Sequence, residues 1–342
     1  MKEYAGSNLL VDICHLPQFN LFKNFIIDNR KKYNIDVLVM DRGRLVSIAR
    51  NELPDDVNIK VIGDYGKNNG LISLVFLVII PRLFQLWKII RSEKYNLVLS
   101  SAWYANLIAY IHNLPNVIFT DDPRPLIKNI WQLSATEIYL PYFYKPQGKF
   151  KNYNCLKEWS YLNPGDLTLN KGVLSNYKLK EKSYIFVREV SVKSANYSNQ
   201  LSNSILSVAE KIPNDIPVLL SLEDKSFKEK YPGHWVVLEE PVQHIHSLMY
   251  FSKIVISSGD SMAREGAILG VKSLYVGERE MPANKVLEEE GMLEKIKIEA
   301  LPEKVNEIYS KKYDDQEKYR KRLDQKWQRI DEVLDKIVEN YM

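Results

Sequence analysis

Residues 254–277, IVISSGDSMAREGAILGVKSLYVG, predict a strand, a tight polar turn, a helix, a short loop and a second strand. The apolar run 254–256 is typical of a buried strand, and residues 257–261 form the turn. The helical spacing of residues 262–269 ends at Gly270, because glycine readily adopts the left-handed conformation that terminates helices. A strand, a helix and a strand in this order indicate a parallel sheet.

The turn of this segment has the composition of an anion site. Small polar residues at a helix start leave backbone N–H groups facing outward, and the helix dipole favours negative charge there. We therefore take Ser258, Gly259, Asp260 and Ser261 as candidate phosphate-binding residues. Glu265 lies one turn further along on the same side, where its carboxylate can accept hydrogen bonds from ribose hydroxyls. This combination indicates a nucleotide-sugar site. An ordinary crossover helix with a polar N-cap is the alternative.

Length and composition indicate two soluble domains. The chain has 342 residues and a net charge of +4, from 47 basic and 43 acidic residues. That charge is too small to indicate nucleic-acid binding, and no such motif occurs. The two cysteines, Cys14 and Cys155, fit a reducing cytoplasm and offer no disulfide framework or zinc site. The start, MKEYAGSN, lacks the apolar core of a signal peptide. His244 and His246 have no evident third partner for a metal.

One strongly apolar stretch, residues 71–90 (LISLVFLVIIPRLFQLWKII), allows several interpretations. Pro81 and Arg82 interrupt it, so its uncharged part is too short to cross a bilayer. We predict a core helix packed on a sheet. The alternative is a peripheral membrane contact. In that interpretation a partly exposed apolar face, with Arg82, Lys88 and Arg91 at its rim, rests on the inner face of an anionic membrane.

The rest of the chain alternates between strands and helices. Expected strands lie at 9–14, 36–40, 58–62, 97–100, 116–120, 183–187, 218–222, 235–238 and 254–256. Expected helices lie at 19–33, 71–90, 102–112, 204–211, 247–251, 262–269 and 314–342. Pro and Gly residues between 141 and 182 indicate an interdomain connection. We predict two Rossmann-like, doubly wound domains, 1–172 and 173–342, with the terminal helix packing back on the first. Their strand ends would face a central cleft.

Several motifs, in their order, resemble an uncharacterised archaeal and bacterial family of GT-B-like proteins. That family is related to GT-B glycosyltransferases and to UDP-N-acetylglucosamine 2-epimerases. The motifs are VDICHLPQFNLFKN at 11–24, VIGDYG at 61–66, FTDD at 119–122, KEWSYL at 157–162, FVR at 186–188 and residues 259–270. The resemblance implies the GT-B fold and a nucleoside diphosphate sugar, with UDP as the favoured nucleotide.

The resemblance also assigns roles to residues of the second domain. The turn 258–261 matches the phosphate-binding turn, and Glu265 matches the ribose-binding carboxylate. Arg188, just after the first strand of that domain, is placed to meet the diphosphate. A surface ion pair with Glu189 is the alternative role of Arg188. Val242 and His244 occupy the loop that often holds the base of the nucleotide.

In the first domain the resemblance points to catalytic groups. His15 follows the first strand, where some inverting GT-B enzymes carry a histidine base, and Asp12 precedes it. Asp121 and Asp122 lie near the position of the catalytic carboxylates of the epimerases. Their alternative role is to cap the next helix. The chain has only Gly259 where the epimerase turn has two glycines, and it lacks the epimerase start Gly-Thr-Arg-Pro-Glu. Both departures disfavour epimerase chemistry.

We therefore expect a metal-independent GT-B glycosyltransferase that needs no cofactor. It would transfer a sugar from its nucleotide to a glycan or lipid-linked acceptor in surface polysaccharide or glycolipid assembly. His15 or Asp12 would deprotonate the acceptor, while Arg188 and the helix N-terminus would stabilise the leaving diphosphate. One alternative is a UDP-sugar 2-epimerase or hydrolase on the same fold. The other is a non-catalytic nucleotide-sugar-binding protein.

Overall fold

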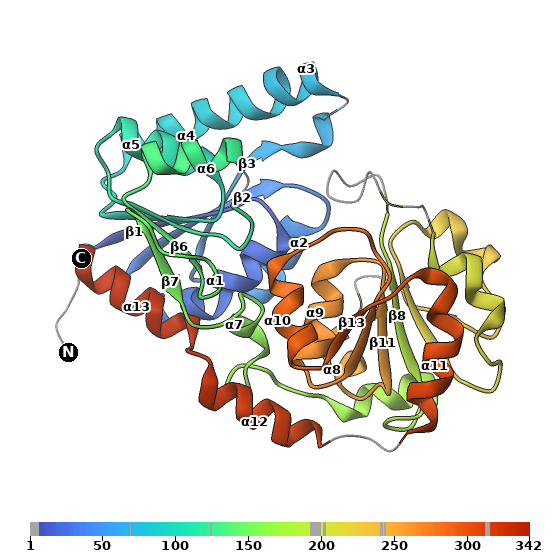
Figure 1. The fold of residues 1–342 in the computed structure, drawn as a ribbon. Coiled ribbons are helices and arrows are strands. Elements are labelled where there is room, and N and C mark those ends of the chain that lie inside the picture. The colour runs from blue at the N-terminus through green and yellow to red at the C-terminus, as the bar shows by residue number, and fades with distance from the viewer. Residues whose placement is uncertain are drawn as a thin grey trace. The chain divides into compact units, whose positions relative to one another are not determined.

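The computed structural model describes residues 7–68, 70–123, 125–191, 200, 203–239, 242, 244–311 and 315–342 (Figure 1). The chain divides into two compact units. Unit 1 comprises Met1–Tyr161 and Trp327–Met342, and unit 2 comprises Leu162–Lys326. The expected boundary after residue 172 thus lies inside unit 2. The last helix belongs to unit 1, where Asn29 donates a hydrogen bond of 2.9 Å to Asp335.

Unit 1 is built on a parallel sheet in the order β3-β2-β1-β4-β5-β6-β7. The strands are β1 (Asn8–Ile13), β2 (Asn34–Asp41), β3 (Asn58–Asp64), β4 (Leu97–Ser100), β5 (Asn116–Phe119), β6 (Glu137–Pro141) and β7 (Phe150–Tyr153). The α-helices are α1 (Leu16–Asn29), α2 (Leu45–Glu52), α3 (Leu71–Ser73), α4 (Ile80–Ser92), α5 (Trp103–Ile111), α6 (Pro125–Ser134), α7 (Trp159–Leu162) and α13 (Ile330–Tyr341). Helices α4 and α5 cover one face of the sheet, and α1 and α13 cover the other (Figure 1). Because both faces are covered, β1 and β2 are buried along most of their length, and their buried residues are apolar apart from Asp12 and Asp36.

Unit 2 is built on a second parallel sheet in the order β10-β9-β8-β11-β12-β13. The strands are β8 (Ile185–Glu189), β9 (Val218–Leu222), β10 (Val236–Val237), β11 (Ile254–Ser257), β12 (Lys272–Tyr275) and β13 (Leu293–Lys295). The α-helices are α8 (Ile245–Tyr250), α9 (Asp260–Ile268), α10 (Pro282–Glu289), α11 (Leu301–Ser310) and α12 (Gln316–Lys326). Short 3-10 helices are η1 (Tyr65–Lys67) in unit 1 and η3 (Lys171–Tyr177), η4 (Ile205–Lys211), η5 (Lys225–Lys230) and η6 (Ile298–Ala300) in unit 2. The core on one face joins β8, β9 and β11 to η4 and α11.

The predicted doubly wound α/β class is confirmed in both units, with local differences. Strand β7 lies inside the segment expected to be an irregular connection. Its four residues are buried only at Phe150 and Tyr153, too short a pattern to be recognised. The expected single helix of the tail is instead two helices, α12 and α13, separated around the buried Trp327. Residue 314, its expected start, lies outside the described residues.

The segment 254–277 forms the predicted strand, helix and strand, β11, α9 and β12. Gly270 has a φ of +79°, and its N–H donates to the Ala267 carbonyl at 3.0 Å, which closes the helix. Gly266 lies against the sheet. A Cβ there would come within 2.5 Å of the Ser273 Oγ and 2.8 Å of the Val255 Cβ. Only glycine therefore lets α9 pack this closely on β11 and β12.

The apolar stretch forms a continuous helix, Leu71–Ser92, that passes through α3, the π-helical segment η2 (Leu74–Ile79) and α4. Pro81 does not end it. A proline ring clashes with the carbonyl four residues earlier, and the wider π turn, where the Ile80 N–H donates to the Val75 carbonyl, relieves that clash. By length and composition the helix could cross a membrane. Only 17% of its most apolar stretch of 18 residues is buried. The predicted core helix is thus correct for one side only.

Arg82 is the residue of this helix that the sequence interpretation misplaced. It does not lie at a solvent rim, because its side chain is completely buried. The guanidinium pairs with the Asp12 carboxylate on β1 and donates to the Ile62 carbonyl on β3. Gly63 makes room for it, since a Cβ at that position would lie 3.2 Å from the Arg82 Cδ. The pair fastens α4 to the middle of the sheet.

We expect Arg82→Met to destabilise unit 1 by about 3–5 kcal/mol, because the Asp12 carboxyl group would remain completely buried without its partner. Urea unfolding followed by tryptophan fluorescence measures this change. The matched control is Lys23→Met, which removes an exposed ion pair with Glu52 and should cost less than about 1 kcal/mol. The double variant Asp12→Leu/Arg82→Met should recover part of the loss. Equal, small effects of Arg82→Met and Lys23→Met would contradict the anchoring role.

Candidate functional site

Each sheet has one place where its strand order reverses, and candidate residues gather there. In unit 1 the reversal lies between β1 and β4, and in unit 2 between β8 and β11. Ligands of open parallel sheets bind outside the carboxyl ends of the strands at such a switch point. His15 follows β1, Arg188 lies at the end of β8 and Ser258 follows β11. The topology therefore places the predicted residues where ligands of each sheet are expected.

The turn after β11 is held rigidly by buried serines. Ser257 Oγ accepts from the Gly259 N–H at 3.0 Å and donates to the Gly259 carbonyl at 2.7 Å. Ser258 Oγ accepts from the Val190 N–H at 2.9 Å, which ties the turn to the end of β8. Ser258 is completely buried, so its side chain shapes the turn, and the contact of its backbone with a ligand stays a prediction. Ser261, at the first turn of α9, is partly exposed.

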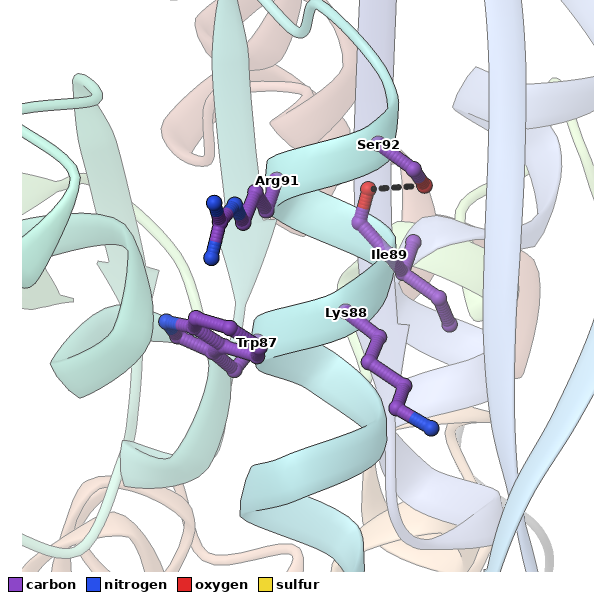
Figure 2. A pocket seen from close by; sticks show the side chains of 5 residues that line it. All are labelled: Trp87, Lys88, Ile89, Arg91 and Ser92. Atoms are coloured by element: carbon purple, nitrogen blue, oxygen red, sulfur yellow. Dashed lines mark hydrogen bonds between the residues drawn. The ribbon is translucent and has the colours of Figure 1, made fainter.

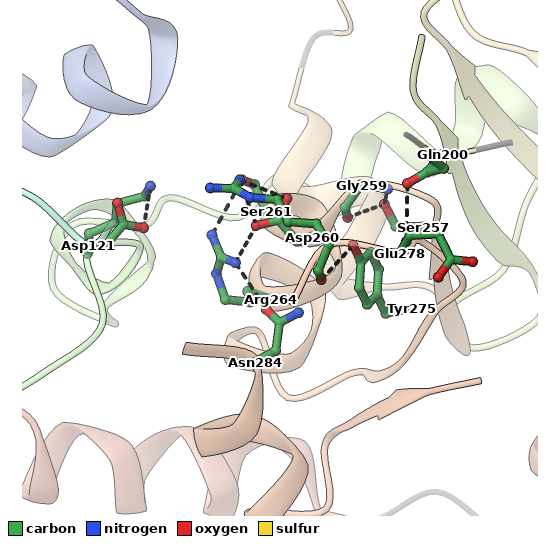
Figure 3. A network of polar contacts seen from close by, with 12 residues as sticks. Asp121, Gln200, Ser257, Gly259, Asp260, Ser261, Arg264, Tyr275, Glu278 and Asn284 are labelled. Atoms are coloured by element: carbon green, nitrogen blue, oxygen red, sulfur yellow. Dashed lines mark hydrogen bonds and ion pairs between the residues drawn. The ribbon is translucent and has the colours of Figure 1, made fainter. Parts of the chain in front are cut away.

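Asp260 is the centre of a buried ionic network at the start of α9 (Figure 3). Its carboxylate lies 2.8 Å from Arg264 Nη1 and 3.3 Å from Arg279 Nη1. Arg264 also donates to the Asn284 amide oxygen at 3.0 Å. Asp260 is completely buried, so its side chain holds this network together, and the contact of its backbone with a ligand stays a prediction. Two guanidinium groups therefore lie beside this carboxylate at the N-terminus of α9, where the helix dipole also favours negative charge.

The sequence interpretation missed both arginines of this network. Arg264 lies four residues after Asp260 on α9, a spacing that does indicate an ion pair on one helix face. Arg279, whose side chain is 19% exposed, comes from the loop after β12. No local pattern marks Arg279, because only the adjacency of β11 and β12 brings it to Asp260.

Glu265, one turn into α9, keeps a partly accessible carboxylate. Its side chain is 12% exposed, and its Oε2 lies 3.3 Å from the Nε2 of His246 on α8. A carboxylate has about four acceptor positions and can accept hydrogen bonds from more than one donor at once. His246 was not among the predicted site residues. Its orientation toward Glu265 is a product of the packing of α8 on α9.

The loop before α8 contains the residues predicted to hold a nucleotide base. Val242 is partly exposed and His244 is exposed. His244 begins α8 with a left-handed φ of 52°. Gln243, between them, lies outside the described residues. The structure thus leaves both predicted residues accessible without giving them a shared contact.

Arg188 and Glu189 point to different environments at the end of β8, as neighbours on a strand do. Arg188 donates to the Ser221 Oγ at 2.9 Å and lies 3.7 Å from the Glu223 carboxylate. Its expected alternative partner, Glu189, is instead buried, and accepts from the Ile205 N–H at 2.8 Å and the Tyr231 hydroxyl at 3.1 Å. Burial raises the pKa of Glu189. Arg188, with 18% of its side chain exposed, remains accessible to an anion.

His15 lies at the switch point of unit 1 in contact with an arginine. Its Nε2 is 2.7 Å from Arg42 Nη1, and the Arg42 guanidinium lies over the Tyr65 ring at 4.0 Å. Burial, and then the charges of Arg42 and Lys157, lower the pKa of His15 to about 3. The imidazole is therefore neutral and accepts a hydrogen bond from Arg42. This arrangement makes His15 a weak proton acceptor, which disfavours its predicted role as the base.

Gln18, which the sequence interpretation missed, bridges the two chain segments at this switch point. Its Oε1 accepts from the Cys14 N–H at 2.7 Å, and its Nε2 donates to the Ser101 carbonyl at 3.2 Å. One amide thus joins the chain leaving β1 to the chain leaving β4. Polar residues are common in the first turn of a helix, so position alone did not distinguish Gln18.

The three aspartates predicted as catalytic groups have different environments. Asp12 is completely buried against Arg82, so its predicted role as the base is corrected to a structural one. Asp121 forms an ion pair of 2.6 Å with Lys157, and 14% of its side chain is exposed. The Asp122 N–H donates to the Thr120 hydroxyl at 3.3 Å, and Asp122 is partly exposed. The accessible carboxylates at this edge are therefore those that follow β5.

Within the described ranges, no group of three or more His, Cys, Asp and Glu side chains is arranged to hold a metal ion. The charged groups at the strand ends are instead arginines, a lysine and carboxylates. Such a set binds anions and hydroxyl groups directly.

Comparisons with known proteins identify the family and the fold of the chain. The model of the family described as "Protein of unknown function (DUF354)" matches residues 8–341. No curated protein matches the sequence. A UDP-N-acetylglucosamine 2-epimerase from Rickettsia bellii is similar in structure, with a TM-score of 0.67 and 12% identity, covering 98% of this chain and 96% of that one.

Two further solved structures are similar. The UDP-GlcNAc 2-epimerase of Methanocaldococcus jannaschii, in complex with UDP-GlcNAc and UDP, has a TM-score of 0.65 and 13% identity, covering 93% of this chain and 98% of that one. The glycotransferase of kitacinnamycin has a TM-score of 0.63 and 12% identity, covering 98% and 99%. These likenesses confirm the predicted GT-B-type two-domain α/β fold and the resemblance to an uncharacterised GT-B-like family.

We expect His15 to remain neutral down to about pH 4. Its folded pKa of about 3 lies below the ordinary value near 6.5, so the unfolded chain binds more protons between these values. The contribution of His15 to stability is therefore constant above pH 6.5 and declines as the pH falls toward 3. Arg42→Met should raise the pKa of His15 and reduce this loss, as measured by NMR titration of the imidazole. Arg44→Met, an exposed change nearby, should leave the titration unaltered, and a wild-type midpoint near pH 6.5 would refute the expectation.

Proposed function

We propose that this chain, which belongs to the DUF354 family, binds a nucleoside diphosphate sugar at the switch point of unit 2 and transfers the sugar to an acceptor hydroxyl group. The observation that carries the proposal is the juxtaposition at the start of α9. An electropositive helix N-terminus lies beside the partly accessible Glu265 carboxylate, with Arg188 at the end of the neighbouring strand. A nucleoside diphosphate sugar offers an anion and hydroxyl groups to match these groups.

The diphosphate would be held by three features. The first-turn N–H groups of α9 find no partner within the helix and point toward an anion. Arg188 lies on the neighbouring strand β8, directly opposite Ser257 of β11. Arg279 contributes a further partly exposed cation. Together these groups would also stabilise the negative charge that develops on the diphosphate when it leaves.

Glu265 would recognise the ribose. Its carboxylate accepts hydrogen bonds, and each charge-assisted bond to a hydroxyl group is worth about 1.5–3 kcal/mol. His246 fixes its orientation through the 3.3 Å contact. We propose UDP as the nucleotide because one of the similar structures is a complex with UDP-GlcNAc and UDP.

The acceptor must lose a proton when its oxygen attacks the anomeric carbon. Asp121 and Asp122 are the carboxylates we propose for that step, because Asp12 is buried and the His15 imidazole is engaged by Arg42. The Lys157 ammonium lies 2.6 Å from the Asp121 carboxylate and holds it in place. An ionised carboxylate at hydrogen-bonding distance from a hydroxyl group can accept its proton.

Epimerisation of the sugar nucleotide at C2, or its hydrolysis, is the second candidate reaction. The observation in its favour is that the reported structural neighbours include two UDP-N-acetylglucosamine 2-epimerases. Both candidate reactions use the same donor site, so they differ in what happens after the donor binds. The acceptor we propose for transfer is a glycan or a lipid-linked glycan.

An incubation with UDP-GlcNAc in D2O, without an acceptor, distinguishes the candidates. Inversion at C2 breaks the C2–H bond and exchanges that hydrogen with solvent. Epimerisation therefore predicts a new set of sugar signals with deuterium at C2 in the NMR spectrum. Transfer predicts that UDP is released slowly, with no deuterium in the sugar, and that an added acceptor accelerates the release. Binding without any conversion, with or without acceptors, would favour a non-catalytic protein.

The nucleotide is identified by thermal unfolding in the presence of UDP, GDP, CMP and dTDP sugars. A ligand that binds only the folded state at a hundredfold excess over its dissociation constant adds about 2.7 kcal/mol of stability. We expect the UDP sugars to raise the unfolding temperature most. A larger shift with another nucleotide would correct the proposed base.

Glu265→Ala should weaken UDP binding by roughly tenfold to a hundredfold, the loss of about one charge-assisted hydrogen bond. Isothermal titration calorimetry with UDP measures this change, and a thermal scan checks that the variant is folded. The matched control is Glu290→Ala, because Glu290 has a similar exposure of 14% but pairs with Arg322 and Lys326 away from the strand ends. If both variants bound UDP like the wild type, Glu265 would not be the ribose-binding group.

A further inference from the structure

The helix Leu71–Ser92 presents a large uncovered apolar surface. Its inner side is buried at Val78, Arg82, Leu86 and Ile90. Its outer side exposes the apolar side chains of Leu71 (78%), Ile72 (77%), Phe76 (62%), Leu77 (51%), Ile80 (48%) and Phe84 (54%). We call these six residues the apolar face. Monomeric soluble proteins rarely leave so many adjacent large apolar side chains in water, so the face has an occupant.

The apolar face is a convex ridge and not a groove. Ile72, Phe76, Ile80 and Phe84 follow one another at intervals of four residues, which places them in one row along a helix. The helix lies on the outside of the α-helical layer of unit 1 (Figure 1). A ridge has the shape that inserts into a soft, continuous apolar medium. The interior of a bilayer is such a medium, whereas a protein partner would have to supply a matching groove.

The C-terminal end of the helix is basic. Lys88 and Arg91 are exposed there and the helix Leu71–Ser92 contains no acidic residue, whereas Arg82 is buried against Asp12. Lys88 Nζ lies 4.5 Å from the centre of the Phe84 ring, and the Arg91 guanidinium lies 4.9 Å from the Trp87 ring. Lysine and arginine at the end of an apolar helix are complementary to anionic lipid headgroups, to which each contributes about 1 kcal/mol of attraction.

An aromatic cluster marks the level where apolar and basic groups meet. The rings of Phe84 and Trp87 stack at 6.1 Å between centroids, and Arg91 lies directly beside Trp87 in Figure 2. Trp87, Lys88, Ile89, Arg91 and Ser92 line a shallow pocket here. Tryptophan is favoured at the boundary between hydrocarbon and headgroups because its ring is amphipathic. Phe84, Trp87 and Arg91 are therefore neighbours on the helix surface, and they join the apolar face to the basic end.

We propose that the apolar face inserts into the headgroup boundary of an anionic lipid bilayer, so that the helix lies on the membrane and does not cross it. Spanning would require the helix to leave the sheet and to separate Arg82 from Asp12, which places a charge in hydrocarbon. Lying on the surface keeps that pair intact and buries only the face that is already exposed. The inference does not depend on the reaction proposed above.

Co-sedimentation with vesicles tests the proposal on the full-length protein. We expect the wild type to bind vesicles of phosphatidylcholine mixed with phosphatidylglycerol more tightly than vesicles of phosphatidylcholine alone. Leu71→Gln/Ile72→Gln should weaken binding to both by roughly tenfold or more, because two side chains no longer favour the acyl region. Both positions are at least 77% exposed, so the fold should be unaffected, and a thermal scan checks this. Val236→Gln, an exposed apolar position on β10, is the control and should bind like the wild type.

The basic end has its own variant. Lys88→Gln/Arg91→Gln should reduce the preference for vesicles that contain phosphatidylglycerol roughly tenfold. Binding to vesicles of phosphatidylcholine alone should stay unchanged. Failure of the wild type to bind either vesicle would overturn the proposal, as would unaltered binding by Leu71→Gln/Ile72→Gln. Self-association of the wild type on size-exclusion chromatography that disappears in Leu71→Gln/Ile72→Gln would assign the face to a protein interface and overturn it as well. None of these measurements depends on turnover, so they stand apart from any test of the enzyme.

Discussion

The ion pair between Asp12 and Arg82 is the contact on which the arrangement of unit 1 depends. It joins the central strand β1 to α4 inside a completely buried environment, with a second bond from Arg82 to the Ile62 carbonyl on β3. Breaking such a pair strands a charge in the interior, at a cost of about 3–5 kcal/mol. The pair therefore holds one side of the helix against the sheet and leaves its opposite side, the apolar face, uncovered. It also occupies the carboxylate nearest the end of β1.

The two units share one sheet topology but carry different residues where the strand order reverses. In each unit the strand order reverses beside the first strand of the sheet. A polar side chain there joins the two chain segments that leave the neighbouring strands. Gln18 does this in unit 1 by bridging Cys14 to Ser101. Ser258 does it in unit 2 by accepting a hydrogen bond from Val190. These hydrogen bonds hold the backbone at each switch point in one conformation. The accessible groups lie beside them, where ligands of such sheets bind.

Charge compensation distinguishes the two edges. At the start of α9 a buried Asp260 neutralises part of the charge of Arg264 and Arg279, which allows two guanidinium groups to lie near a helix N-terminus. These groups are the ones that we propose for the diphosphate. In unit 1, Arg42 lies against a neutral His15 and Lys157 against Asp121. That edge therefore holds a partly exposed carboxylate, Asp121, and an imidazole, His15, that is a weak proton acceptor.

The local pattern of residues 254–277 was enough to predict β11, α9 and its end at Gly270, because backbone preferences and apolar periodicity act over a few residues. The alternation of strands and helices likewise determined the doubly wound class, and the order of several short motifs indicated a GT-B-like family. The environment of each polar side chain was decided only in the tertiary structure. Asp12, Asp260 and Ser258 have the types expected of ligand-binding residues, yet all three are completely buried. Arg82, Arg279 and His246 obtained their partners from other elements of the fold. The physical reason is that burial and pairing depend on which strands and helices become neighbours, and sequence separation carries no record of that.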